Sequence, residues 1–144
     1  MANVVPNAFK GELLSGTHNF ASGGDSFKLA LYTANPYTTS STAYSSGAGN
    51  EVSGSAAGYL TGGSALTSQA VASSTATASV DFANLTFSSA TFSAAFGAIY
   101  NDDKSDKLVV ILDFGGTKTA TNGDFTIAFP DPSTPSNAII SLTS

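Results

Sequence analysis

The sequence predicts an all-β fold: a β-sandwich or jelly-roll-like single domain preceded by a short N-terminal helix or arm. Short apolar segments, many with alternating apolar and polar residues, are separated by turns roughly every 8–15 residues. One stretch alone has the spacing of an amphipathic helix. A chain of 144 residues buries about 68–70% of its unfolded surface, which is enough for one core. We assign residues 1–20 to the arm and helix and residues 21–144 to the β-sandwich domain.

The first predicted element is a short helix over residues 7–16. Phe9 and Leu13 are four residues apart, so they lie on one face of a helix. Asn7 is a suitable N-cap, and Gly16 suits the position just after the last helical turn. A helix of this length needs packing from other elements.

The next segments predict one strand, a long loop and two further strands. Residues 27–32 alternate, with an apolar face made of Phe27, Leu29 and Leu31. Residues 38–58 are rich in Ser, Thr, Gly and Ala and are typical of a surface loop. Residues 59–80 alternate weakly and predict two strands decorated with Thr and Ser. A flexible Ser/Thr-rich linker is the alternative interpretation of this segment.

The second half of the chain predicts six more strand segments, at residues 80–82, 85–87, 96–100, 108–112, 125–129 and 138–142. Residues 108–112 are apolar without a break, as in a central strand covered on both faces. Residues 101–106 form a polar turn. Asn122-Gly123 is the strongest hairpin signal and predicts a type I′ turn. The proline-rich residues 130–135 end the strand that follows.

Charge is scarce in this chain. The 5 basic and 10 acidic residues make up 10% of the sequence, against about 25% in an ordinary domain, and the net charge is −5. All five basic residues are Lys, so clustered cations for phosphate binding are absent and nucleic-acid binding is disfavoured. No run reaches the roughly 18 apolar residues of a membrane span. A surface of Ser, Thr and Ala is easily desolvated and suits packing into a protein assembly.

A search for catalytic chemistry favours a protein that is not an enzyme and has no cofactor. The chain has no Cys, and His18 is its single histidine, without a Gly-x-Ser-x-Gly nucleophile motif elsewhere. We interpret His18 as a hydrogen-bonded structural residue. Asp102, Asp103 and Asp106 raise the question of a calcium ion. They lack EF-hand spacing and have lysines among them, which favours a solvated hairpin tip.

The aromatic residues divide into two groups. Eight of the ten Phe are predicted to pack in the core, and they are Phe27, Phe82, Phe87, Phe92, Phe96, Phe114, Phe125 and Phe129. Tyr37, Tyr44 and Tyr59 flank or occupy the polar loop and could either contact a partner or cover the edge of the sandwich. A carbohydrate-binding sandwich would have to use these tyrosines.

Several segments, taken together, resemble a family of small virion structural proteins of tailed bacteriophages, and the resemblance covers nearly the whole chain. In order they are Phe9-Lys10-x-Glu12-Leu13-Leu14-x-Gly16-x-His18-x-Phe20, residues 25–33, residues 50–54, Gly58-Tyr59 with Gly62-Gly63, Val80-Asp81-Phe82, Ile99-Tyr100-Asn101, residues 109–114 and residues 123–127. No single motif among them is specific; the resemblance rests on their order and spacing.

The resemblance implies a capsid decoration (cement) protein with a jelly-roll-like fold. Such a protein is made in the bacterial cytoplasm, binds the outer surface of the virion head as dimers or trimers, and bridges capsomers of the major capsid protein. A tail or baseplate component, or a carbohydrate-binding module of the virion, is the alternative. Within this reading we expect capsid or inter-subunit contacts from Val4, Val5, Phe9 and Leu13 of the arm, and from the loop tyrosines Tyr37, Tyr44 and Tyr59. An N-terminal helix that simply covers the core is the competing interpretation of the arm.

Overall fold

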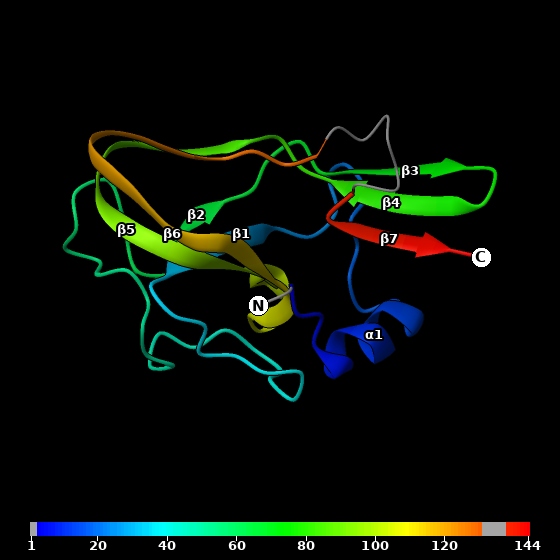
Figure 1. The fold of residues 1–144 in the computed structure, drawn as a ribbon. Coiled ribbons are helices and arrows are strands. Elements are labelled where there is room, and N and C mark those ends of the chain that lie inside the picture. The colour runs from blue at the N-terminus through cyan, green and yellow to red at the C-terminus, as the bar shows by residue number, and fades with distance from the viewer. Residues whose placement is uncertain (1–2, 131–137) are drawn as a thin grey trace.

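The computed structural model describes residues 3–130 and 138–144, and these residues form mainly β-strands with one short α-helix (Figure 1). The elements in chain order are α1 (Asn7–Leu14), β1 (Phe27–Tyr32), β2 (Ser64–Ala65), β3 (Ala70–Ser74), β4 (Thr77–Asp81), β5 (Leu85–Asn101), the 3-10 turn η1 (Asp102–Lys104), β6 (Lys107–Ile127) and β7 (Ile140–Thr143). All but Pro130 of the predicted proline-rich stretch, residues 130–135, lies outside the described residues.

The strands form two antiparallel sheets, a four-stranded one in the order β2-β1-β5-β6 and a three-stranded one in the order β3-β4-β7. The all-β class and the short N-terminal helix are therefore confirmed. The jelly-roll topology is not confirmed. A jelly roll has eight strands in two Greek keys. Here the described strands include two hairpins of sequential neighbours, β3–β4 and β5–β6.

β5 and β6 form one long hairpin that dominates the molecule and bends along its length (Figure 1). The predicted separate strands at residues 85–87 and 96–100 are both parts of β5, so their separation was wrong. Four register shifts interrupt the pairing of β5 with β6, and such β-bulges bend a strand without ending it. The polar turn predicted at residues 101–106 is confirmed, since η1 joins the two strands there.

The hairpin turn predicted at Asn122-Gly123 is wrong. Both residues lie inside β6, and Gly123 pairs with Ala90 of β5. Asn122 has a φ of 50°, in the left-handed region that Asn tolerates better than most residues. The pairing register shifts on both sides of Ala90. The left-handed residue thus serves an irregular, bulged part of the strand.

The helix α1 matches its predicted position but differs in its N-cap. Pro6 occupies that position, and no side chain caps the helix; Asn7 is the first helical residue, and its backbone N–H bonds to the Thr39 carbonyl. The other end is as expected. Gly16 has a φ of 72° and donates to the Leu13 carbonyl, while Thr17 N–H bonds to the Glu12 carbonyl, in the pattern of a Schellman motif.

The four-stranded sheet is covered on both faces. On one face the larger core cluster includes Leu29 and Leu31 of β1 and Phe9 of α1. On the other face a smaller cluster, with Tyr32 and Ile111 at its centre, packs under the loop of residues 38–58. The core role of the phenylalanines is confirmed, because five of the eight are buried and the other three are partly buried. Of these three, Phe114 and Phe129 pack against the larger cluster and Phe96 packs against the smaller one.

Residues 108–111 are fully buried, as the apolar run predicts, but β6 is the outer strand of its sheet and not a central one. Its edge is covered by other segments of the chain. Val4 exchanges backbone hydrogen bonds with Ile111, and Leu108 N–H bonds to the Thr42 carbonyl. The loop predicted over residues 38–58 contains no named strand. Residues 59–80 take part in three strands, β2, β3 and β4, where two were predicted.

Candidate functional site: an apolar groove beside the three-stranded sheet

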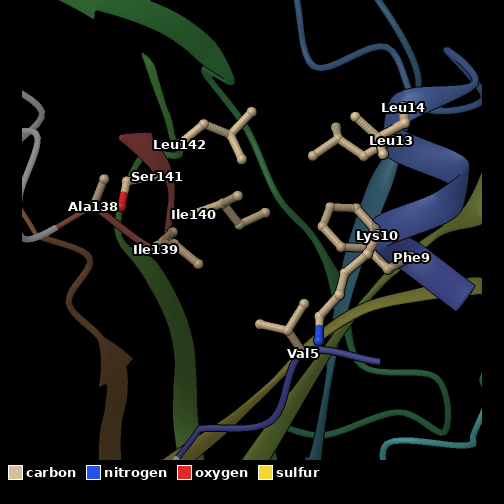
Figure 2. Close-up of a pocket in the computed structure, with 10 residues that line it drawn as sticks. All are labelled: Val5, Phe9, Lys10, Leu13, Leu14, Ala138, Ile139, Ile140, Ser141 and Leu142. Carbon is tan, nitrogen blue, oxygen red and sulfur yellow. The ribbon is translucent and has the colours of Figure 1, made fainter. Parts of the chain in front are cut away.

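An apolar groove of about 500 Å³ separates α1 from β7 (Figure 2). Figure 2 shows Phe9 and Leu13 of α1 on one side, and Ile140 and Leu142 of β7 pointing toward them from the other. Val5 lies at one end of the groove. A second hollow of about 440 Å³ shares Leu13, Ile140 and Leu142 with the first. The two hollows adjoin at these residues, and we call them together the apolar groove.

The register of the three-stranded sheet explains why the groove is apolar. Val71 of β3 pairs with Val80 of β4, and Val80 pairs with Ile140 of β7, so all three side chains lie on one face. Ala78 and Leu142 form the next pair on that face. The alternate positions, mostly Ser, Thr and Ala, lie on the opposite face. The sheet therefore presents an apolar face toward α1.

This apolar face is only partly covered by the rest of the chain. Among the described residues, four large hydrophobic ones are strongly exposed: Leu14 at 89%, Leu60 at 73%, Leu142 at 57% and Val71 at 56%. Leu14, Leu142 and Val71 all line the apolar groove, whereas Leu60 lies in the loop before β2. Contiguous exposed apolar surface of this kind marks binding sites in other proteins, whereas single exposed residues such as Leu60 are common.

A buried polar network fixes α1, and thus one wall of the groove, against the β domain. His18 Nε2 lies 3.0 Å from Glu12 Oε2, and Lys107 Nζ also bonds to the Glu12 carboxylate. Asn101 Nδ2 lies 2.9 Å from His18 Nδ1 and donates to Asp25 Oδ2 at 2.8 Å. The Asn101 amide group is a donor, so His18 Nδ1 accepts, and the ring donates from Nε2 to Glu12. The predicted structural role of His18 is confirmed.

The same network shifts the pKa values of its carboxyl groups. Burial alone would raise the pKa of Glu12, but the hydrogen bonds from Lys107 and His18, together with the Lys107 charge, outweigh it and lower this pKa below its ordinary value. Burial likewise opposes the effect at Asp25, where the bonds from the Asn19 backbone and the Asn101 side chain lower the pKa. Both carboxylates are therefore stabilised in their charged form by the folded structure.

The loop tyrosines are used inside the molecule. Glu51 accepts hydrogen bonds from the hydroxyls of Tyr44 at 3.0 Å and Tyr59 at 2.7 Å, and from Gly62 N–H at 2.6 Å. Tyr44 also stacks on Tyr100, with ring centroids 4.4 Å apart. Burial, together with the Glu51 carboxylate, raises the pKa of both the Tyr44 and the Tyr59 hydroxyl above its ordinary value. These rings attach the loop to the sheet.

The contact role predicted for Tyr37 and Tyr59 is corrected by their burial. They are 7% and 3% exposed, and neither ring is available to a partner or a sugar. Tyr37 bonds to the Tyr32 hydroxyl at 3.0 Å. Tyr44 is partly buried against Tyr100. The sequence could not predict the burial of these tyrosines, because the same local pattern occurs whether a loop tyrosine faces solvent or packs on its own sheet.

The predicted arm residues divide between the groove and the interior. Val5 and Leu13 line the apolar groove, as does Phe9, although the Phe9 ring is only 2% exposed. Val4 is partly buried and bridges to Ile111 of its own chain, so the structure gives it a role in covering β6.

The strongly exposed groove residues that the sequence analysis missed are Leu14, Val71 and Leu142. Their one signal is that they are large apolar residues in exposed positions, and that exposure depends on pairings across the whole chain. A heptad or strand pattern alone would assign such residues to the core.

The acidic hairpin tip contains no visible metal site. Asp102 pairs with Lys28 at 3.0 Å, and Asp103 accepts a hydrogen bond from Ser26 N–H at 2.7 Å. Asp106 contributes its backbone carbonyl to a bond from Tyr44 N–H. Within residues 3–130 and 138–144, no group of three or more His, Cys, Asp or Glu side chains could hold a metal ion.

In comparisons with known proteins, no protein-family model, curated protein or solved structure matches the chain. In the part of the chain that the structure describes, no helix is both long and apolar enough to cross a membrane.

Proposed function

We propose that this chain is a bacteriophage capsid decoration (cement) protein, which binds the outer surface of the virion head and stabilises contacts between capsomers of the major capsid protein. The observation that carries the proposal is the apolar groove, an uncovered apolar face on a small protein with few charges. Such a face supports a role in which the protein binds other protein subunits by burying this apolar surface against them.

The amount of exposed apolar surface suits a contact that is repeated many times. Fully burying a Leu or Val side chain stabilises by about 1.5–3 kcal/mol, and Leu14, Leu142 and Val71 are each more than half exposed. The gain per copy is therefore modest. A head binds many copies, and a bivalent clip gains further from the high effective concentration of its second contact. Modest contacts then suffice to stabilise a shell.

The charges support recognition by apolar contact. Three of the five lysines form ion pairs within the chain, Lys28 with Asp102, Lys104 with Asp25 and Lys107 with Glu12. These pairs leave little cationic surface for phosphate groups. The neutral strands β3 and β7 present Ser, Thr and Ala, which lose less on desolvation than charged groups.

The described polar clusters support a non-enzymatic role. His18 is fully enclosed between Glu12 and Asn101, and Glu51 is engaged by two tyrosine hydroxyls and a backbone amide. The His18 cluster joins segments that are distant in sequence, and the Glu51 cluster holds the loop of residues 38–58 to the segment before β2. Such hydrogen bonds are expected of polar groups that stabilise a fold.

A binding assay on heads that lack the protein tests this proposal. Purified chain is added to such heads, and bound chain is measured by co-sedimentation. We expect saturable binding, reduced about 10-fold or more by Leu14→Asp, because a charge replaces a buried apolar contact. Leu60→Asp, a matched change at an exposed leucine outside the groove, should bind as the wild type does. Binding only to tails would favour the tail or baseplate alternative and overturn the proposal. The absence of binding to both heads and tails would also overturn the proposal.

A further inference from the structure

The edge strands β6 and β7 of the two sheets differ in how they are covered and charged. In the first part of β6, Ile111 exchanges backbone hydrogen bonds with Val4, and Leu108 N–H donates to the Thr42 carbonyl. The exposed part that follows carries Lys118, a residue type that protects free edges. β7, at the edge of the three-stranded sheet, carries no charge, and none of the described residues pairs with its outer side. An uncharged open edge is a template for another strand.

The hydrogen-bond pattern identifies the groups that β7 presents at this edge. Ser144 N–H bonds to the Ala76 carbonyl, and the register pairs Leu142 with Ala78. Antiparallel pairs alternate, so Leu142 directs its backbone groups toward β4. Ser141 and Thr143 then direct their N–H and C=O groups outward. The Leu142 side chain lies on the face of the groove.

We propose that β7 pairs antiparallel with β7 of a second copy of this chain, around a two-fold axis at Leu142. This inference rests on the proposed function and names the partner at the apolar groove. In that register Ser141 of one copy lies opposite Thr143 of the other, and both residues donate and accept a backbone hydrogen bond. The two Leu142 side chains meet on the apolar face, where directly opposite residues lie close together.

Self-complementarity favours a second copy over a different protein. β7 has the sequence Ile-Ser-Leu-Thr, so its self-pairing places no like charges opposite each other despite the net charge of −5. Leu142 lines the groove on the edge strand and is more than half exposed, so the Leu142 of a second copy paired at this edge would extend the apolar face. An isologous contact of this kind closes as a dimer.

The oligomeric state of the purified full-length chain tests the pairing. A four-residue strand covers less surface than the roughly 1,000 Å² of a stable interface, so we expect a dimer dissociation constant of about 10–100 μM. Sedimentation equilibrium over this range should show a monomer–dimer equilibrium. Leu142→Lys should raise the dissociation constant about 50-fold or more, because two lysines would oppose each other. Leu60→Lys is the matched control and should leave it unchanged.

A cysteine variant tests the register independently. The chain has no Cys, so Leu142→Cys introduces the only thiol. Opposite residues of a non-hydrogen-bonded pair have Cα atoms about 4.5 Å apart, within reach of a disulfide. Mild oxidation should produce a covalent dimer quickly, whereas Leu60→Cys should react slowly.

The outcomes separate this inference from the proposed function. A chain that stays monomeric at high concentration, or a dimer insensitive to Leu142→Lys, overturns the β7 pairing. So does a dimer that is lost instead with Val71→Lys on the opposite edge strand, β3. If such a chain still binds heads, the decoration role stands without the dimer. If the dimer forms as described but heads are not bound, the pairing stands and the decoration role fails.

Discussion

Replacing Glu51 with Ala should detach the long loop from the four-stranded sheet. The Glu51 carboxylate accepts three hydrogen bonds, from Tyr44, Tyr59 and Gly62, and the Tyr59 hydroxyl in turn accepts from Leu31 N–H of β1. This one side chain therefore connects the loop of residues 38–58, the approach to β2 and the sheet. Without the Glu51 side chain, the hydroxyls of Tyr44 and Tyr59 lose their acceptor.

The expected magnitude follows from these contacts. A hydrogen bond to a charged group contributes roughly 1.5–3 kcal/mol, so three such bonds would contribute at most about 9 kcal/mol. Glu51 is only partly buried, so water will replace some of the lost bonds. We expect Glu51→Ala to lower the free energy of unfolding by about 3 kcal/mol. That is a large share of the 5–15 kcal/mol typical of a domain.

Urea unfolding followed by circular dichroism measures this loss, and an unchanged slope would show that the two-state comparison is valid. Asp124→Ala is the matched control, because it removes an exposed carboxylate of β6 and should change stability by no more than about 0.5 kcal/mol. Equal effects of the two substitutions would refute the reasoning, since Glu51 would then contribute no more than an ordinary surface charge.

Two further predictions concern the helix network and a glycine. Folding lowers the pKa of Glu12, so the ionised Glu12 carboxylate stabilises the fold above about pH 4.5, and this stabilisation is lost as the pH falls through the folded-state pKa. Glu12→Gln should therefore flatten the acid side of a plot of unfolding free energy against pH. An unchanged plot would contradict this. A Cβ at Gly63, where φ is +77°, would lie 1.8 Å from the Leu29 carbonyl oxygen, so Gly63→Ala should lower the free energy of unfolding by about 3 kcal/mol or more. Gly49 has a φ of +85° but open space around it, so Gly49→Ala should lower the same quantity by only about 1 kcal/mol. The same urea assay measures both.

Local patterns predicted the elements whose structure depends on nearby residues. The alternation of Leu29 and Leu31 identified β1, and Gly16 identified the end of α1, because side-chain periodicity and left-handed glycine are local properties. Asn122-Gly123 misled for the same reason. The pair favours left-handed backbone, but whether that backbone makes a turn or a bulge depends on the partner strand β5.

The candidate site depends on contacts that no local pattern contains. Leu14 and Leu142 are far apart in sequence and become neighbours across the groove only when α1 is fixed beside the three-stranded sheet. The attachment of α1 uses the Glu12–Lys107 contact, which joins residues on two distant elements. Burial of the loop tyrosines likewise depends on Glu51, whose partners the sequence does not indicate.

The copy number of the protein in purified virions tests the decoration role most directly. Quantitative mass spectrometry compares peptides of this chain with peptides of the major capsid protein. We predict a ratio on the order of one copy per capsid subunit, or one per few, because a contact this modest stabilises a shell only when it repeats over the lattice. A few copies per particle, or none, would contradict the account.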